Sequence, residues 1–338
     1  MDTSSMSGMR RRALLACGSA LGASLFGLHD RAVAEPAPET KRLRLVHAPF
    51  ICMAPQYLAE ELLGGEGFTD WEYLQVGSRS AGIDAVVEGR VDMTMWDACS
   101  PIPLIDAGKP IVILAGVHSG CFQLFCNERV RTVRELQGKT AAIHYFGGGD
   151  HVLLSSMLAY VGIDPQKEVH WVTGQGANAR DVFAEGKADA FIGFAQEPAE
   201  LRLKNVGHVI LDTAKDRPWS QYFCCVVVAN REFVGRNPVA TKRALRAILK
   251  SADVCAADPE RAARFLADKL YETRYPIGLE VMKTAQYNRW RQSNPEDTLR
   301  FHTLRLRDGG LLKSSPQQLI AKGTDWRFLD QLKRELKG

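Results

Sequence analysis

A phrase that occurs twice constrains the fold of this chain most. Residues 86–97 read VVEGRVDMTMWD, and residues 182–194 read VFAEGKADAFIGF. In both copies a helical pattern ends at Glu-Gly, and a basic residue, an apolar residue and an aspartate then lead into a short apolar run. Glycine commonly ends a helix, and a short apolar run between turn residues is typical of a buried strand. The repeat therefore predicts two similar α/β units in series.

Short apolar runs and helical patterns alternate around both copies of the phrase. We expect strands over residues 43–47, 71–76, 91–95, 110–117, 140–143, 169–172, 190–193 and 206–211. We expect helices between them over residues 55–63, 80–88, 103–107, 132–136, 150–161 and 179–184. Strict alternation predicts a parallel sheet covered by helices. The C-terminal part is largely helical, with helices expected over residues 238–257, 262–271, 276–287, 295–308, 316–321 and 325–337.

Residues 1–34 predict an export signal. Three arginines, Arg10 to Arg12, precede a small and apolar run, and Ala32-Val33-Ala34 offers a cleavage site. The apolar run over 13–28 is shorter than the roughly 20 residues that a spanning helix needs. The arginines favour a twin-arginine signal, and ordinary secretion is the alternative. Cys17 follows them too closely for a lipoprotein box, so we expect a soluble, periplasmic mature chain without a lipid anchor.

The size and charge of the mature chain restrict its class. Loss of residues 1–34 removes four arginines and two aspartates, which leaves 39 basic and 37 acidic side chains. A nearly neutral chain without a basic block argues against a nucleic-acid partner. A mature chain of this length exceeds one ordinary core and predicts two lobes.

The cysteines of the mature chain are odd in number and irregularly spaced. They are Cys52, Cys99, Cys121, Cys126, Cys224, Cys225 and Cys255. The adjacent pair Cys224-Cys225 is expected to be buried as small apolar residues, because neighbouring cysteines rarely close a disulfide. No spacing is typical of a zinc site, and we expect neither a metal nor a cofactor. A disulfide elsewhere would suit an oxidising compartment, and its pairing stays open.

Ligands of open α/β sheets bind at the carboxyl ends of the strands, and helix N-termini there accept anionic or hydrogen-bond-accepting groups. The expected ligand-binding residues follow strands, begin helices or precede the apolar run over residues 223–228. They are Phe50, Gln56, Ser78, Arg79, Trp96, Asp97, His118, Tyr145, Gly148, Gln196, Glu197 and Trp219.

Structural roles compete with several of these assignments. Trp96 fits core packing, Arg79 fits a solvated surface, and His118 fits a local backbone contact. Asp150 fits a helix cap better than a metal cluster with His144 and His151. No Gly-x-Ser-x-Gly motif or convincing triad occurs, so we expect no catalytic residue.

The charges around the expected cleft bear on the ligand. Asp97 and Glu197 would oppose a small anion and favour a cation or an N–H donor. Aromatic side chains at Phe50, Trp96, Tyr145 and Phe194 offer stacking faces. These residues favour a nitrogen-containing, partly aromatic solute.

Several phrases carry a family resemblance over residues 42–338. They are HAPFICMAPQYLAEELLGGEGF (47–68), the two Glu-Gly phrases, RVRTVRELQGKTAAI (129–143) and NPVATKRALRAILKSAD (237–253). In these phrases the chain resembles the periplasmic solute-binding proteins of ABC importers, in the nitrate, sulfonate and taurine group. That group shares its fold with thiamine-pyrimidine-precursor binding and synthesis proteins.

The resemblance implies the fold of a type II periplasmic binding protein, with two Rossmann-like α/β lobes joined by a two-segment hinge. Lobe I would comprise residues 42–120 and 223–338, and lobe II residues 121–222. The chain would cross between the lobes near residues 117–126 and 221–228.

The resemblance also implies a function. A monomeric, non-enzymatic protein would capture a small solute between its lobes and deliver it to an ABC permease in the membrane. Binding of sulfonate, taurine or nitrate is one alternative, and sensing of a ligand for a membrane receptor is another. A third is an enzyme like the pyrimidine synthases, whose cysteine-rich iron-binding segment is reduced here to Cys224-Cys225.

Overall fold

The computed structural model describes residues 35–76, 79–174, 178–194 and 196–336. The expected export signal, with Arg10 to Arg12, Cys17 and Ala34, lies outside the described residues. Residues Ala37–Gly338 form one compact unit. Within the described part of the chain, no helix is both long and apolar enough to cross a membrane.

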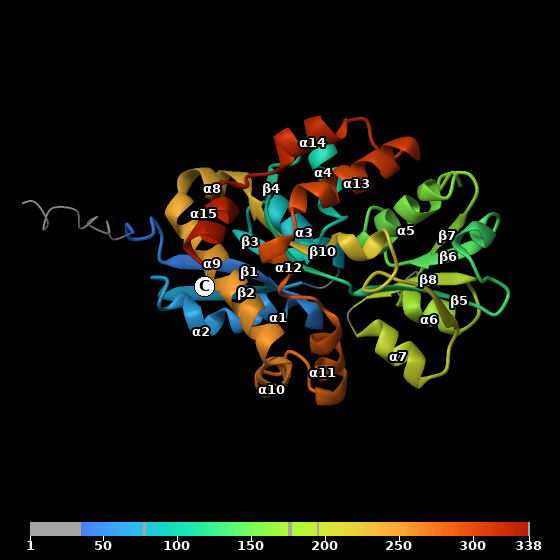
Figure 1. The fold of residues 1–338 in the computed structure, drawn as a ribbon, viewed down its shortest axis with the longest axis horizontal. Helices are drawn as coiled ribbons and strands as arrows, with labels where there is room; N and C mark the ends of the chain where they lie inside the picture. The colour runs from blue at the N-terminus through green and yellow to red at the C-terminus, as the bar shows by residue number, and fades with distance from the viewer. Residues whose placement is uncertain (1–34, 77–78, 175–177, 195, 337–338) are drawn as a thin grey trace, which may run out of the picture. The chain divides into compact units, whose positions relative to one another are not determined.

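The described strands form three sheets (Figure 1). The first pairs β1 (Arg42–His47) in parallel with β2 (Asp70–Gln75). In the second, β10 (Phe223–Asn230) lies between β3 (Met93–Asp97) and β4 (Ile111–Ser119) and is antiparallel to both. The third has the order β7-β6-β8-β5-β9 and comprises β5 (Phe122–Cys126), β6 (Thr140–Ile143), β7 (His170–Thr173), β8 (Ala190–Phe194) and β9 (His208–Asp212).

The expectation of a purely parallel arrangement is wrong. Strand β6 is parallel to β7 and β8, but β5 runs antiparallel to β8 and β9. Parallel neighbours need a crossover helix between them, whereas β5 and β10 enter their sheets from the segments that connect one sheet to the other. The alternation of helical and strand patterns in the sequence therefore does not reveal that β5 and β10 run antiparallel to their neighbours.

Helices cover the sheets and form most of the C-terminal part. Their bounds are α1 (Ala54–Leu58), α2 (Glu60–Leu63), α3 (Arg79–Val87), α4 (Pro101–Asp106), α5 (Gly149–Tyr160), α6 (Ala179–Ala184), α7 (Glu197–Leu203), α8 (Arg231–Arg236), α9 (Pro238–Ala257), α10 (Pro259–Asp268), α11 (Tyr275–Thr284), α12 (Arg289–Gln292), α13 (Pro295–Asp308), α14 (Pro316–Gly323) and α15 (Arg327–Glu335). Short 3-10 turns add η1 (Ile51–Met53), η2 (Val133–Leu136) and η3 (Trp219–Gln221).

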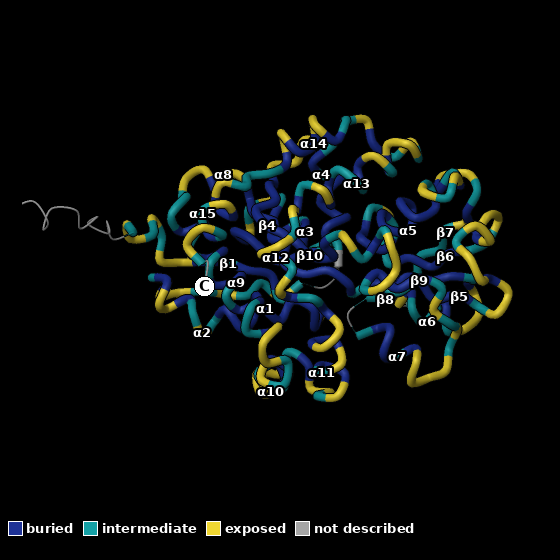
Figure 2. Tube along the Cα trace, viewed as in Figure 1, coloured by how far each residue is buried: buried dark blue, intermediate teal, exposed yellow. Residues whose placement is uncertain are grey.

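The chain passes twice between the second and third sheets. It leaves β4 and enters β5 over Gly120 and Cys121, and it returns from β9 to β10 over residues 213–222. Gly120 has φ +73°, and a Cβ atom there would lie 2.7 Å from Ala214, so the first passage needs glycine. Both β4 and β10 are buried along their whole length (Figure 2). The third sheet uses only residues 122–212, and the division into lobes at 120/121 and 222/223 stays a prediction.

Candidate functional site

A small cavity of about 20 Å³ lies where the ends of β3 and β8 meet the segments that pass between the sheets. Its lining combines residues after β1, the last residues of β3 and β8, the passage into β5, the loop after β6 with the first turn of α5, and the start of β10. They are Phe50, Cys52, Met53, Trp96, Asp97, Cys121, Phe122, Tyr145, Gly149, Asp150, Phe194, Cys224 and Cys225. The two repeated phrases thus supply Asp97 and Phe194 to the same space.

Aromatic rings form much of the cavity wall. The Phe50 ring lies 5.6 Å from Trp96 in an edge-on arrangement and 5.1 Å from Phe194. Phe122 lies 5.0 Å from Phe194 on the other side. A Cβ atom on Gly82 of α3 would lie 2.3 Å from the Trp96 ring, so that glycine lets the indole lie against the helix. The wall offers faces and edges for an aromatic or cationic group.

The Asp97 carboxylate lies in the same cavity and is tightly held. Its Oδ1 accepts hydrogen bonds from the backbone N–H groups of Cys99, at 3.0 Å, and Ser100, at 2.7 Å. Its Oδ2 accepts one from Ser100 Oγ at 2.6 Å. Burial nevertheless raises the pKa of Asp97 to about 6, and the charge of Asp150 adds to this rise.

The N-terminus of α5 approaches Asp97 closely. A Cβ atom on Gly149 would lie 2.4 Å from Asp97 Oδ1, so only glycine permits this approach. Gly148 is the N-cap of α5, and a Cβ atom there would lie 2.8 Å from the Tyr145 ring. The partial positive charge of a helix N-terminus therefore lies beside a buried carboxylate.

In the segment before α5, a largely buried histidine side chain lies between two carboxylates. His144 Nδ1 lies 2.8 Å from Asp150 Oδ2, and His144 Nε2 lies 3.2 Å from Glu197 Oε1. Asp150 also accepts a hydrogen bond from the His144 N–H, and Glu197 accepts one from the Phe194 N–H. Asp150 lines the cavity, so this assembly links the α5 start to the end of β8.

The expectation that Asp150 caps α5 is wrong. The helix begins one residue earlier, and the carboxylate is turned towards His144. His151 lies apart from His144, since its Nδ1 accepts a hydrogen bond from the Gly147 N–H and its ring packs against Trp171. This agrees with the preference for a structural role of these residues over a metal cluster.

Four of the expected ligand-binding residues line the cavity, namely Phe50, Trp96, Asp97 and Tyr145. Gly148 and Glu197 are not in the lining but contact it, Gly148 next to the Tyr145 ring and Glu197 through a hydrogen bond from the Phe194 N–H. Gln196 Nε2 donates a hydrogen bond to the Pro49 carbonyl at 2.8 Å, and so joins the end of β8 to the segment after β1.

The other expected residues lie elsewhere. Gln56 is fully buried and makes hydrogen bonds to the backbone of Val46 and Met95, so its side chain serves the core. Trp219 packs against Tyr160 and Phe301, away from the lining. His118 belongs to a cluster of cysteines. Ser78 lies outside the described residues, and of Arg79 only the backbone, at the start of α3, is described.

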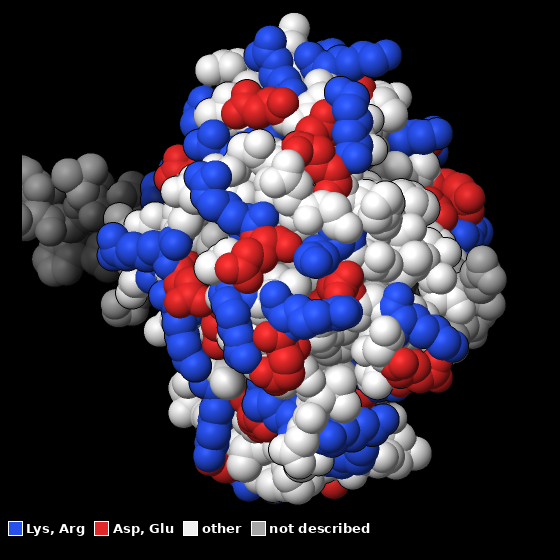
Figure 3. Space-filling view, turned by 90° about the vertical axis from the view of Figure 1, so that its right-hand side faces the viewer, with Lys and Arg blue, Asp and Glu red and all other residues white. Residues whose placement is uncertain are grey.

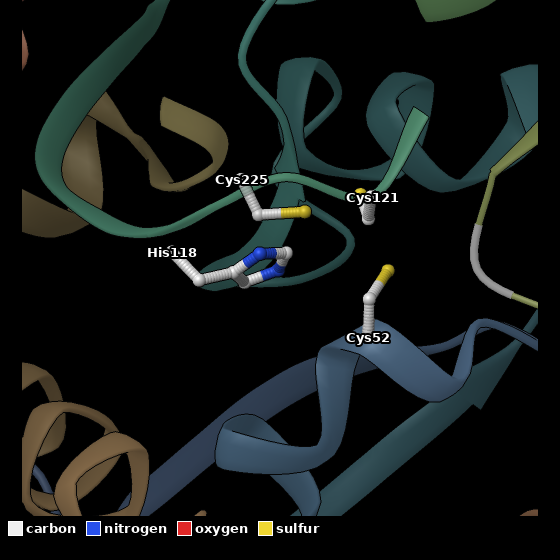
Figure 4. A group of neighbouring side chains, drawn as sticks. All are labelled: Cys52, His118, Cys121 and Cys225. Carbon is white, nitrogen blue, oxygen red and sulfur yellow. The ribbon is translucent and has the colours of Figure 1, made fainter. Parts of the chain in front are cut away.

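The cysteines were the main feature that the sequence reasoning missed. Cys121 and Cys224 form a disulfide, which corrects the expectation that Cys224 is merely a small apolar residue. Cys52, His118, Cys121 and Cys225 bring their potential metal-binding atoms within 4.8 Å of one another (Figure 4). A hydrogen bond between Cys52 and Cys225 lowers the pKa of Cys52 and raises that of Cys225. These residues come from three distant segments, so no local spacing could reveal the group.

Comparisons with known proteins agree with this architecture. A family model described as NMT1/THI5 like matches residues 69–262. The 4-amino-5-hydroxymethyl-2-methylpyrimidine phosphate synthase THI5 of Saccharomyces cerevisiae is 25% identical over 231 residues, which are 64% of this chain and 65% of that protein. The chain thus matches less than two thirds of that relative's length.

Two solved structures are also similar. The periplasmic nitrate-binding protein NrtA from Synechocystis PCC 6803 has a TM-score of 0.73 and 18% identity, covering 89% of this chain and 90% of that one. The alkanesulfonate-binding protein SsuA from Xanthomonas axonopodis pv. citri, bound to MOPS, has a TM-score of 0.68 and 17% identity, covering 87% and 99%. At such identities the likeness establishes the fold, which is that of the periplasmic binding proteins.

Proposed function

This chain belongs to the NMT1/THI5-like family, and we propose that it is a solute-binding protein of an ABC importer. In this proposal the exported, periplasmic chain captures a small nitrogen-containing, partly aromatic solute between two lobes. It then delivers the solute to a membrane permease. It acts as a monomer and catalyses no reaction.

The observation that carries the proposal is the chemistry of the cavity wall. Asp97 and Asp150 lie among the rings of Phe50, Trp96 and Phe194, and no described side chain of the lining is basic. Buried carboxylates favour a cation or N–H donors, and aromatic faces favour a flat or cationic group. A sulfonate or nitrate would instead need several donors in place of these two acids.

The small size of the cavity supports a closing motion. Pockets for small organic ligands typically measure about 300–1,000 Å³, far more than the space present here. Entry of a solute therefore requires the two sides of the cavity to separate. Separation would break the Gln196–Pro49 hydrogen bond and part the Phe50 and Phe194 rings.

The charge distribution of the surface is consistent with a small-molecule partner. On the face drawn in Figure 3, basic and acidic side chains are interspersed without a block of one sign. Such a surface does not favour nucleic acid, which attracts a continuous basic patch.

Two alternatives rest on particular observations. Binding of an anion such as a sulfonate or nitrate is suggested by the two similar structures, which are a nitrate-binding and an alkanesulfonate-binding protein. A synthase-like activity is suggested by the yeast relative, which is a synthase, and the partly buried His144 between two carboxylates would be its candidate acid–base group.

A thermal-shift screen of the purified chain tests the proposal. The panel holds pyrimidines, amines, taurine, alkyl sulfonates, nitrate and aromatic acids. A ligand at 100 times its dissociation constant adds about 2.7 kcal/mol to the free energy of unfolding. We expect stabilisation by nitrogen compounds that Asp97→Asn weakens. Stabilisation by sulfonates or nitrate alone would refute the proposed solute class, and turnover of a bound pyrimidine precursor would favour the enzyme.

A further inference from the structure

Four side chains from three segments converge beside the cavity. Cys52 comes from η1, His118 from the end of β4, Cys121 from the passage to β5, and Cys225 from β10. Their sulfur and ring nitrogen atoms all lie within 4.8 Å of one another. In Figure 4 the His118 ring and the Cys225 sulfur point towards the side on which Cys52 and Cys121 lie. Tetrahedral zinc with bonds of about 2.0–2.3 Å needs donor atoms roughly 3.5–3.8 Å apart. The donors therefore need only small inward shifts to hold an ion.

His118 gives independent evidence that the group is more than apolar packing. Its side chain is fully buried, and its Nε2 makes no hydrogen bond of ordinary geometry among the described residues, although the ring interacts with the Cys52 thiol and helps to lower the pKa of that thiol. The ring is held edge-on by Tyr287, and Nδ1 lies 3.5 Å from the Ser119 carbonyl. A buried nitrogen without a partner costs free energy, and a metal ion would satisfy it. A histidine whose other nitrogen faces a backbone carbonyl is also a common arrangement for a metal ligand.

The Cys121 sulfur can be bonded to Cys224 or can coordinate a metal ion, but it cannot do both. It is bonded to Cys224 in the structure, and the Cys224 sulfur lies 3.9 Å from that of Cys225. A metal binds the thiolate form of cysteine, and a disulfide sulfur carries no such charge. The Cys121 sulfur can therefore complete a set of four donors only after the disulfide opens.

We propose that Cys52, His118, Cys121 and Cys225 form a site for one thiophilic metal ion of the Zn²⁺ class, and that this ion and the Cys121–Cys224 disulfide exclude each other. An external dithiol reduces the disulfide to two thiols and is itself oxidised to a disulfide. Binding of Zn²⁺ then releases one proton from each of the three ligand cysteines, while His118 binds as neutral imidazole and Cys224 stays a thiol.

A route from solvent reaches the site. Cys121 is half-buried, and besides the small cavity it lines a groove of about 770 Å³ together with Gly120, Lys215 and Gln286. A dithiol or an ion can therefore approach this sulfur although Cys52, His118 and Cys225 are buried. The three-cysteine, one-histidine donor set is typical of closed structural zinc sites.

Equilibrium dialysis of the purified chain against Zn²⁺ alone, with elemental analysis, tests the proposal. After treatment with a dithiol that is then removed without oxygen, we expect one Zn²⁺ per chain. The untreated chain should bind about 100-fold more weakly. Equal binding before and after reduction would overturn the proposal.

Matched variants separate the ligands from ordinary buried cysteines. Cys52→Ser should lose tight binding in the reduced state, whereas Cys255→Ser, another fully buried cysteine outside the group, should keep it. Cys224→Ser cannot form the disulfide and should bind Zn²⁺ without reductant. The assignment would be contradicted if Cys52→Ser and Cys255→Ser lost Zn²⁺ affinity equally. It would also be contradicted if Cys224→Ser bound Zn²⁺ only after treatment with a reductant.

A measurement on the unmodified chain guards against variants that fail to fold. In the reduced chain, Zn²⁺ should slow alkylation of Cys121, a ligand, and leave the alkylation rate of its former partner Cys224 nearly unchanged. Mass spectrometry of the alkylated peptides reports both rates. Protection of neither residue, or equal protection of both, would refute the site.

Discussion

Gly149→Ala tests whether the contact between α5 and Asp97 supports the observed structure. The new Cβ atom would lie 2.4 Å from Asp97 Oδ1 and 2.4 Å from its Cγ, far inside ordinary contact distance. The carboxylate cannot simply rotate away, because it is held by Ser100 and Cys99. The start of α5 must therefore move. Overpacking of this kind typically costs about 1–3 kcal/mol.

Thermal and urea unfolding measure this cost. The entropy of unfolding is about 2.1 cal/mol/K per residue, or about 0.6 kcal/mol/K for the compact unit Ala37–Gly338, so we expect Tm to fall by about 2–5 °C. Gly235→Ala in α8 is the control, because its Cβ atom meets nothing within 4 Å. That change should be neutral or stabilising by a few tenths to 1 kcal/mol.

A double variant isolates the clash from other effects. Asp97→Ala removes the atoms that the new methyl group meets, so Gly149→Ala should cost much less in that background. The coupling free energy should exceed about 0.5 kcal/mol, the scale seen for residues in contact. If Gly149→Ala unfolds at the same temperature as Gly235→Ala, or if its cost is unchanged by Asp97→Ala, the described approach of α5 to Asp97 is wrong.

Three further predictions concern buried polar groups. The pKa of Asp97 is about 6 in the native state and 3.8 in the unfolded state, so the folded state favours the protonated carboxyl. Its contribution to the free energy of unfolding therefore falls by about 3 kcal/mol as the pH rises through 4–6. Urea titrations of Asp97→Asn should lack this loss. The pKa of His302 is about 4 in the native state and 6.5 in the unfolded state, because the folded state favours the neutral ring. Its contribution to the free energy of unfolding is therefore lost as the pH falls from 6.5 to 4. Urea titrations of His302→Gln should lack this loss, and an unchanged pH dependence would contradict the prediction. Gln56→Ala leaves the Met95 N–H without a hydrogen bond and should lower the free energy of unfolding by about 1–3 kcal/mol without changing solute affinity. Reduced affinity at unchanged stability would instead place Gln56 in the binding site.

Local signals explain which elements could be predicted. Helices α9 and α13 were predicted with the observed bounds, because a proline stands at the first position of each after an asparagine. In α13 the Asn294 side chain accepts a hydrogen bond from the Glu296 N–H, as expected of a cap. The directions of β5 and β10 could not be read in this way, because strand pairing depends on the path of the whole chain.

The candidate site shows the same division between local and long-range information. The repeated phrase placed Trp96 and Asp97 at the end of a strand, and both line the cavity. The place of Gln56 near a helix start favours a binding role, but its side chain instead makes hydrogen bonds with the backbone of Val46 and Met95 in the core. The disulfide joins residues 103 positions apart, and a spacing that long carries no local signal.

Solute binding and metal binding can be tested separately, because Asp97 and the sulfur cluster offer different chemistry. Its oxygens already accept three hydrogen bonds from Cys99 and Ser100, so the carboxylate has little capacity left to bind an ion. Its negative charge still acts across the cavity, where it favours a cationic or N–H-bearing solute. The sulfur cluster, by contrast, offers soft donors that an organic amine would not need. Loss of solute binding in Asp97→Asn with Zn²⁺ binding retained, and loss of Zn²⁺ binding with solute binding retained in His118→Gln, which changes a residue outside the cavity lining, would therefore identify two sites with different chemistry.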